Sequence, residues 1–209
     1  MEHTLSPSQA TRAKQQQLKF HHWSANTHQT TYHITNTSHT TSHGVRLQLM
    51  DRGANGGLAG NDVRVLYKTD RKVNVTGIDN HELQGLDVVN CASLLQTNLG
   101  PVILIMNQYA YLGHGRTIHA ACQFEHYQNK VDDRTVPCGV FQCVEFLNGY
   151  KAPLVSKTGL LYLESGGPPS DDDLATYPHI YATSECDWHP ECIDYIHDPH
   201  SDWVNNIPS

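Results

Sequence analysis

No lysine or arginine follows Lys157 in this 209-residue chain, although ten aspartate and glutamate residues lie beyond that point. The chain has a formal net charge of -7, whereas its first 157 residues hold all 14 basic side chains and only 11 acidic ones. No stretch is basic enough to indicate an electrostatic contact with nucleic acid. The charge distribution therefore predicts an acidic C-terminal tail and no direct nucleic-acid binding.

Long apolar runs are also missing. The longest run of aliphatic residues and methionine is Val102–Met106, far shorter than the roughly 20 residues that cross a bilayer as a helix. The N-terminus is polar through Lys19 and has no apolar signal core. Six cysteines are scattered through a chain without an export signal, which favours reduced thiols. We therefore expect a cytoplasmic protein with no membrane partner.

The stretch with the strongest functional pattern is 45–57. Apolar residues alternate over 45–49, the period of a half-buried strand, and Asp51 falls on the same face. A glycine-rich turn follows, in which Gly53 permits close approach and Ala54 is small enough to pack tightly. Asp and Gly are also common in ordinary turns, so Asp-x-Gly here could be a turn with no catalytic function. A carboxylate at a strand-to-loop corner is, however, the arrangement that aspartic proteases use.

The run Asp51–Val65 resembles the protease segment of copia-type LTR retroelement polyproteins. It is especially similar to a subgroup from unicellular algae, in which Asp-Ser-Gly-Ala-Asn-Gly-Gly is followed by a valine-rich strand. The resemblance extends loosely to a Gly-Leu-Tyr-like strand at 159–162 and so covers about residues 45–164. It implies an all-β fold over residues 44–164, a retropepsin-like (acid protease) barrel with one short helix.

The same resemblance implies a role for each residue of the loop. Asp51 is the expected catalytic residue, and Arg52, Gly53 and Ala54 form the expected active-site loop. Proteases of this type are homodimers because each chain brings one Asp, and this chain has no second Asp-Thr/Ser-Gly. We therefore expect an aspartic endopeptidase that acts on peptide or polyprotein substrates as a homodimer and uses no cofactor.

Arg52 departs from the family pattern. The family usually has Thr or Ser at this position, and the hydroxyl bonds across the dimer interface. Two guanidinium groups buried at the two-fold axis would repel each other and lose solvation, and a nearby positive charge would hold Asp51 ionised. The departure predicts a weak, acid-shifted or inactive enzyme. It keeps open a catalytically inactive protease-like domain that serves in dimerisation or binding.

A hairpin is expected some 25 residues beyond Asp51, where retroviral-type proteases place the flap that closes over substrate. Strands are predicted at 63–67, 73–77 and 83–89, with turn residues between the last two. The candidate flap residues are Gly77, Ile78, Asp79, Asn80 and His81. An ordinary hairpin accounts for this pattern equally well.

Further elements are predicted after this hairpin. They are a central strand at 101–106, a short helix at 117–126, and a hairpin with Asn148-Gly149 as its turn. In such a turn both residues adopt positive φ. A second turn is predicted at Lys157-Thr158-Gly159, followed by a last strand at 160–163.

Two flanking segments are predicted to have little order. Residues 1–43 form a flexible leader rich in Ser, Thr and His, and residues 165–209 form an acidic, low-order tail. The tail holds weak candidates for zinc ligands: Cys186, His189, Cys192 and His197. Their spacing does not match the Cys-x2-Cys start of a zinc knuckle, so we expect no metal. A small Cys/His zinc-binding interaction protein stays open as a third alternative.

Overall fold

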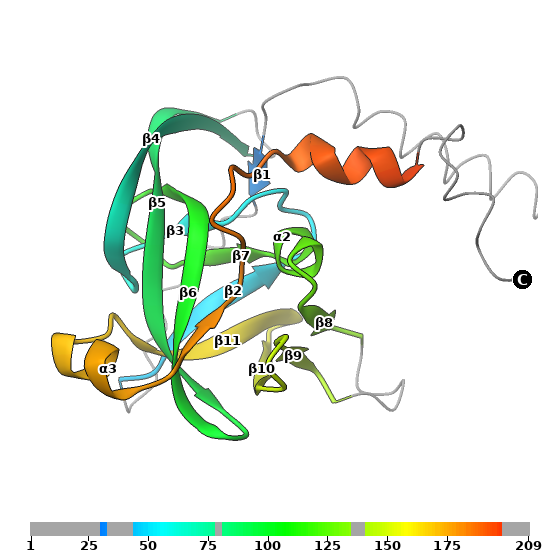
Figure 1. The fold of residues 1–209 in the computed structure, drawn as a ribbon. Coiled ribbons are helices and arrows are strands. Elements are labelled where there is room, and N and C mark those ends of the chain that lie inside the picture. Colours follow the sequence, from blue (N-terminus) through cyan, green and yellow to red (C-terminus); the bar gives the residue numbers. More distant parts are fainter. Residues whose placement is uncertain (1–29, 33–43, 78–80, 135–140, 198–209) are drawn as a thin grey trace, which may run out of the picture.

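The computed structural model describes residues 30–32, 44–77, 81–134 and 141–197. Strands dominate these residues, with two short helices and one 3-10 helix (Figure 1). In chain order the elements are β1 Thr30–Tyr32, β2 Arg46–Asp51, β3 Leu58–Ala59, β4 Arg64–Gly77, β5 Glu82–Thr97, β6 Gly100–Tyr111, β7 Ile118–Ala120, α2 Ala121–His126, β8 Lys130–Asp132, β9 Cys143–Glu145, β10 Lys151–Lys157, β11 Leu160–Gly167, α3 Asp171–Thr176, β12 His179–Tyr181 and η2 Pro190–His197.

The strands form one mixed sheet in the order β1-β4-β5-β6-β3-β7-β2-β11-β10-β9-β8, with β12 added alongside β6. The all-β prediction is therefore confirmed. The predicted barrel is not, because the order ends at β1 on one side and at β8 on the other. Strand β11 pairs with both β2 and β5, so the sheet folds back on itself around the main core.

Strands β5 and β6 supply a large share of the core. Val102–Met106, predicted as a central strand, is buried within β6, and the strand continues to Tyr111. Such an unbroken apolar run is typical of a strand covered on both faces. One face of β6 meets Phe124 of α2 and Leu163 of β11 in the main core cluster. The other carries Ile103 and Ile105 against α3.

The predicted strands at 63–67 and 73–77 form one continuous strand, β4, which pairs along its length with β5. The register with β5 shifts in the polar stretch between them, from Lys68 to Lys72. Lys68 and Lys72, on either side of the shift, both pair with Asp87 on β5. Opposite charges on facing strands stabilise such pairing. The result is a long hairpin whose tip, residues 78–80, lies outside the described residues.

The helix predicted at 117–126 is only half helical. Residues Ile118–Ala120 form β7, which pairs in parallel with β2 and aligns Asp51 with Ala120. The helix α2 begins at Ala121 and ends at His126. Both elements are buried on the side that faces the core, so the apolar pattern alone does not separate a short strand from a helix. This strand-to-helix corner brings α2 beside the end of β2 (Figure 1).

The turn with two residues of positive φ was predicted at Asn148-Gly149, but the structure has it in the next hairpin, at Thr158-Gly159. Asn148-Gly149 does connect β9 to β10, but only Gly149 has positive φ, and its N–H donates to the carbonyl of Phe146. Thr158 and Gly159 both have positive φ and form the two-residue turn between β10 and β11. Because type I′ turns match the strand twist, the tighter hairpin requires the left-handed pair.

The flanking segments are more structured than predicted. Within the leader, Thr30–Tyr32 pairs in parallel with the end of β4. The segment predicted as a low-order tail holds α3, β12 and η2, and β12 pairs with the centre of β6. Ser170 caps α3 through a capping box with Asp173, which the sequence Ser-Asp-Asp-Asp encodes locally. None of the helices in the described part of the chain has the length and apolarity needed to cross a membrane.

We predict that Thr158→Asn stabilises the protein by about 0.5–1 kcal/mol, because asparagine tolerates the left-handed region better than a β-branched residue. Thr158 is exposed at φ 51°, and the substitution removes only one local bond, from its hydroxyl to the carbonyl of Lys157. Urea denaturation measures the change. Asn148→Thr is the matched control, and it should shift the midpoint little. A less stable Thr158→Asn variant would contradict this account of the turn.

Candidate functional site

Strand β2 delivers Asp51 to the surface from a fully buried base. Residues 47–50 are buried on both faces, rather than on one face as the alternation predicted. Leu47 and Leu49 pack into the second core cluster, and Met50 packs into the main one. Pairing with β7 and β11 on either side fixes the strand to its last residue. Asp51 therefore projects from a rigid support, as a catalytic side chain requires.

The two oxygens of the Asp51 carboxylate have different surroundings. Oδ1 accepts a hydrogen bond from the backbone N–H of Gly53 at 2.7 Å. Oδ2 is buried and accepts no hydrogen bond from any residue that the structure describes. Leaving a buried polar atom unsatisfied is costly, so Oδ2 of Asp51 calls for an explanation, as does the buried Oδ2 of Asp62. This oxygen is the strongest chemical signal in the predicted active-site loop.

The small residues of the loop have distinct roles. A Cβ atom at Gly53 would lie 3.2 Å from Oδ1 of Asp51, so a larger residue would crowd the carboxylate. Ala54 is 2% exposed and packs in the second core cluster, as its size predicted. A Cβ atom at Gly57 would lie 2.3 Å from the ring of Tyr109, so only glycine fits there. The loop thus needs small residues for close packing more than for flexibility.

Gln123 of α2 holds this loop against β6. Its Oε1 accepts from the N–H of Gly57 at 2.9 Å, and its Nε2 reaches the carbonyls of Asn107 and Gln108. These two residues form a bulge in β6, where Gln108 has φ 60° and the register with β5 shifts. Sequence reasoning missed Gln123 and Gln108. The one available signal was a polar amide within an otherwise apolar segment.

The Asn107–Gln108 bulge also anchors the chain that follows β12. Asn107 and Thr183 exchange three hydrogen bonds, including a pair between the Asn107 backbone and the Thr183 hydroxyl. The side-chain amide of Gln108 donates to the carbonyl of Glu185 at 3.3 Å. A bulge redirects side chains out of the sheet. Here both side-chain amides contact the C-terminal segment, while the backbone carbonyls of the bulge accept from Gln123 of α2.

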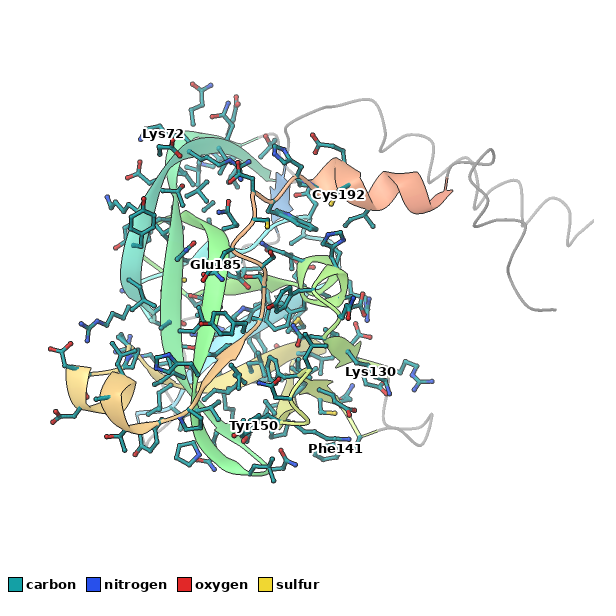
Figure 2. The ribbon with its side chains drawn as sticks, in the orientation of Figure 1. Lys72, Lys130, Phe141, Tyr150, Glu185 and Cys192 are labelled. Atoms are coloured by element: carbon teal, nitrogen blue, oxygen red, sulfur yellow. The ribbon has the colours of Figure 1, made fainter. Side chains whose placement is uncertain are left out.

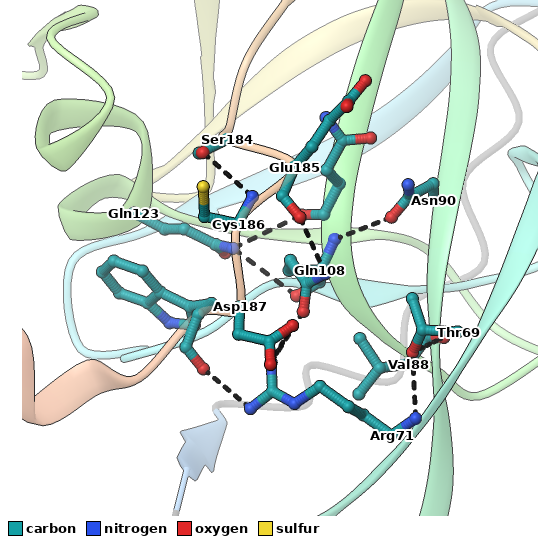
Figure 3. A network of polar contacts seen from close by, with 12 residues as sticks. Thr69, Arg71, Val88, Asn90, Gln108, Gln123, Ser184, Glu185, Cys186 and Asp187 are labelled. Carbon is teal, nitrogen blue, oxygen red and sulfur yellow. Dashed lines mark hydrogen bonds and ion pairs between the residues drawn. The ribbon is translucent and has the colours of Figure 1, made fainter.

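Residues 184–189, which we call the strap, cross beside the loop and α2 without regular structure. Figure 3 shows Arg71 of β4 reaching the strap, where it donates to the carbonyl of Trp188 and pairs with Asp187 at 3.6 Å. Arg71 also donates to Oε1 of Gln108 at 2.7 Å. Figure 2 shows Glu185 on the strap in front of β6 and Cys192 in η2.

Trp188 joins the strap to the predicted active-site loop. Its indole N–H donates to the carbonyl of Asn55 at 2.7 Å, and its ring meets His126 of α2 edge-on at 5.2 Å. Asn55 lies four residues after Asp51, on the far side of the turn. The strap therefore contacts three parts of the site: Arg71 of β4, the loop at Asn55, and His126 of α2. Sequence reasoning assigned no role to Trp188.

Arg52 does not carry an uncompensated charge. Its guanidinium forms a bidentate pair with Glu125 of α2, a further pair with Asp133, and a 3.0 Å bond to the carbonyl of Val131. The Glu125 carboxylate is the main cause of the raised pKa of Arg52. The premise of a bare positive charge beside Asp51 is therefore wrong for the single chain. Arg52 instead fastens the loop to α2 and β8. The sequence alone does not show which residues pair with it.

Beneath the loop, His119 lies in a buried polar network. Its Nε2 contacts Oε1 of Gln48 at 3.1 Å, and its Nδ1 contacts the hydroxyl of Tyr109 at 3.0 Å. Because an amide oxygen only accepts, Nε2 carries the proton and Nδ1 accepts from Tyr109. Burial next to Phe124 lowers the pKa of His119 to about 3. His119 is thus a neutral structural residue.

A second buried polar pair fixes the start of β7. Asp62 accepts from the N–H and hydroxyl of Thr117 at 2.9 and 2.6 Å, and Thr117 in turn accepts from the N–H of Gly60. Burial raises the pKa of Asp62, whereas the hydrogen bonds from Thr117 lower it in part. These bonds hold the chain after β3 against β7, so they stabilise the strand that flanks Asp51.

The weak zinc candidates do not gather into a site among the residues with placed side chains. Cys186 and His189 are exposed on the strap. The Sγ of Cys192 lies 3.9 Å from Nε2 of His126, a residue of α2. The side chain of His197 and all of His200 lie outside the described residues. The described part of the chain therefore offers no set of three His, Cys, Asp or Glu residues for a metal.

Thiol chemistry near the loop is also unfavourable. Cys122 of α2 donates to the carbonyl of Ala54 at 3.3 Å, and burial raises its pKa to about 11. A thiol of this kind is protonated at neutral pH and is a poor nucleophile. Five cysteines in the described residues carry free thiols: Cys91, Cys122, Cys143, Cys186 and Cys192.

The flap candidates fall only partly within the described residues. Gly77 ends β4, and its N–H donates to the carbonyl of His81 at 2.8 Å, so the two strands are closed just before the tip. Ile78, Asp79 and Asn80 lie outside the described residues. The hairpin is present where it was predicted, and its role as a flap stays a prediction.

Comparison of the chain with family models, with curated proteins and with solved structures finds no match. Function is therefore inferred from the geometry of the site and from the sequence pattern.

We predict that Arg52→Ala lowers the free energy of unfolding by about 1 kcal/mol, because Glu125 and Asp133 both lose their partner. Urea denaturation measures the loss. Arg134→Ala is the matched control, since Arg134 also pairs with an Asp, two residues away, but its side chain is more exposed. A variant lacking Arg52 that is as stable as the wild type would show that the Arg52 ion pairs contribute nothing.

The buried His119 predicts a loss of stability in acid. Below pH 6.5 the unfolded chain protonates this histidine, whereas the folded chain resists protonation until about pH 3. Stability therefore falls as the pH drops through this window, by about 2–3 kcal/mol at pH near 4.5. His119→Gln removes this contribution and leaves the opposing one from Asp62 in place. Urea midpoints at neutral and acidic pH should differ more in the wild type than in the variant. Equal pH dependence would contradict the assignment.

Proposed function

We propose that the chain is an aspartic endopeptidase of a retroelement-type polyprotein, which acts as a homodimer with one Asp51 from each copy. The observation that carries the proposal is the unsatisfied, buried Oδ2 of Asp51 beside an Oδ1 held by Gly53. In the proposed dimer the atoms that cover this oxygen move aside, and the second carboxylate shares a proton with it. The proposal makes the dimer the state in which the site is complete.

The chemistry follows from such a pair of carboxylates. The ionised Asp takes a proton from water as the water oxygen bonds to the scissile carbonyl carbon, while the protonated Asp gives its proton to the carbonyl oxygen. The tetrahedral intermediate then collapses, the C–N bond breaks, and the leaving amine takes up a proton from a carboxyl group. No metal or cofactor enters these steps.

The order of elements supports a retropepsin-like arrangement. A buried strand ends at Asp51, the small-residue loop follows, and the long β4–β5 hairpin comes next at the spacing expected of a flap. The strand-to-helix corner of β7 and α2 then returns beside the end of β2. A peptide substrate would lie between the hairpin and the loop. The same proposal takes the cytoplasm as the site of action and assigns no membrane or nucleic-acid partner.

Arg52 is compatible with this role. Its charge is compensated by Glu125 and Asp133 within the chain, so it does not by itself force both Asp51 carboxylates to ionise. The hydroxyl that relatives use across the interface is still missing at this position. We therefore expect a weaker dimer than in proteases with Thr or Ser after the catalytic Asp.

A second candidate function is a protease-like domain that binds peptides without cleaving them. The bond from Trp188 to the carbonyl of Asn55 favours it, because a segment of the chain already lies against the loop. In this case the contacts around the loop serve recognition only. Hydrolysis that pepstatin inhibits separates the two functions.

We predict that Asp51→Asn lowers peptide hydrolysis at acidic pH by at least about a thousandfold, because an amide cannot act as the base or share the proton. A mixture of quenched fluorogenic peptides serves as substrate, with and without pepstatin. Asp172→Asn, at an exposed position in the first turn of α3, is the matched control and should retain activity. Circular dichroism should show both variants folded. Equal cleavage by the wild type and Asp51→Asn would reject Asp51 as the catalytic residue.

A further inference from the structure

We propose that Arg71, Gln108 and Asn55 form a recognition site for an extended peptide with a carboxylate directly before a tryptophan, and that the strap occupies this site in cis. The inference rests on the proposed function only in taking the bound peptide as a segment of the substrate. The recognition itself follows from contacts within this chain (Figure 3).

The contacts that hold the strap are the kind that recognise an extended peptide. Two of its backbone carbonyls, at Glu185 and Trp188, accept hydrogen bonds from the side chains of Gln108 and Arg71. Main-chain contacts of this kind bind any peptide of suitable shape, and side-chain contacts then select its sequence. The spacing of three residues between the two carbonyls sets the register of the bound segment.

Selectivity comes from the Asp187-Trp188 pair. Arg71 pairs with the carboxylate of Asp187 at 3.6 Å and donates to the backbone carbonyl of Trp188. It therefore recognises both the acidic side chain and the main chain of the bound segment. The indole N–H of Trp188 donates to Asn55, and the ring lies edge-on to His126. A flat aromatic ring with one polar edge matches these two neighbours. The ligand class is therefore an acidic residue followed by an aromatic donor.

The strap is held more weakly than the chain before it. Residues 179–183 pair with β6, bury Ile180 and Ala182, and lock Thr183 to Asn107. From residue 184 the pairing ends, and most side chains are exposed. Segments with few buried contacts open at a lower free energy than the core to which they are attached. The strap can thus leave its site while β12 stays in the sheet.

The site is part of the molecular framework, independent of the strap. Arg71 donates to Oε1 of Gln108, and the N–H of Gln108 donates to Oδ1 of Asn90. Arg71 is 21% exposed with the strap in place. Neither of these two bonds involves the strap. A peptide in trans would therefore meet a preorganised site, which lowers the entropic cost of binding.

Peptide binding to full-length chains tests the proposal. The probe is a fluorescein-labelled peptide that copies residues 182–191, with serine in place of the cysteine, and fluorescence anisotropy reports binding. The double variant Asp187→Asn/Trp188→Ala weakens the strap as a competitor. It should bind the probe at least tenfold more tightly than the wild type. Adding Arg71→Ala should reverse this gain. Arg64→Ala is the matched control, because Arg64 pairs with Asp171 of α3 and does not contact the strap.

Equal affinity of the wild type and the double variant would overturn the proposal, as would tight binding that survives Arg71→Ala. Hydrogen exchange provides a second test that needs no strap variant. In Arg71→Ala, exchange should rise at residues 184–189 and stay slow at 179–183, whereas an equal rise in both would reject a separable strap. Neither assay measures hydrolysis. Loss of proteolysis with retained binding would therefore reject only the proposed function.

Discussion

The bulge at Asn107–Gln108 in β6 is the constraint on which the rest of the site depends. One extra residue in this strand turns two amide groups out of the sheet. At this bulge the backbone carbonyls of both residues accept bonds from Gln123 of α2, which holds the loop after Asp51, and Asn107 bonds Thr183, which holds the segment after β12. The core strand, the loop after Asp51 and the C-terminal segment are thereby joined at one point. A regular strand would leave each of these contacts unmade.

This rigidity holds the Asp51 carboxylate in one orientation. Asp51 stands at the end of a strand that is buried and paired on both sides, with one oxygen held and the other unsatisfied. A flexible side chain would turn that oxygen to water, whereas a fixed one needs a partner group. Arg52 contributes by clipping the loop to Glu125 rather than by facing the carboxylate. Under the proposed function, the site of one chain is half of a symmetric arrangement.

Much of the fold was predictable because it is encoded locally. The strand that ends at Asp51, the apolar run of β6 and the positions of the hairpin turns all depend on a few neighbours. The errors arose where long-range contacts determine the structure. Strand β4 continues through a polar register shift between Lys68 and Lys72, and pairing with β2 makes Ile118–Ala120 a strand. Gln108 escaped notice because a bulge has no short-range signature, and Trp188 because its partner lies 133 residues away.

The account stands on the meeting of two Asp51 side chains, so the mass of the particle in solution tests it most directly. Sedimentation velocity of the full-length chain, at neutral and acidic pH and over a range of micromolar concentrations, measures this mass. The account predicts a reversible dimer, favoured under acidic conditions in which one of the two carboxyl groups keeps its proton. A strict monomer under every condition would contradict it, because a lone Asp51 cannot supply both the acid and the base.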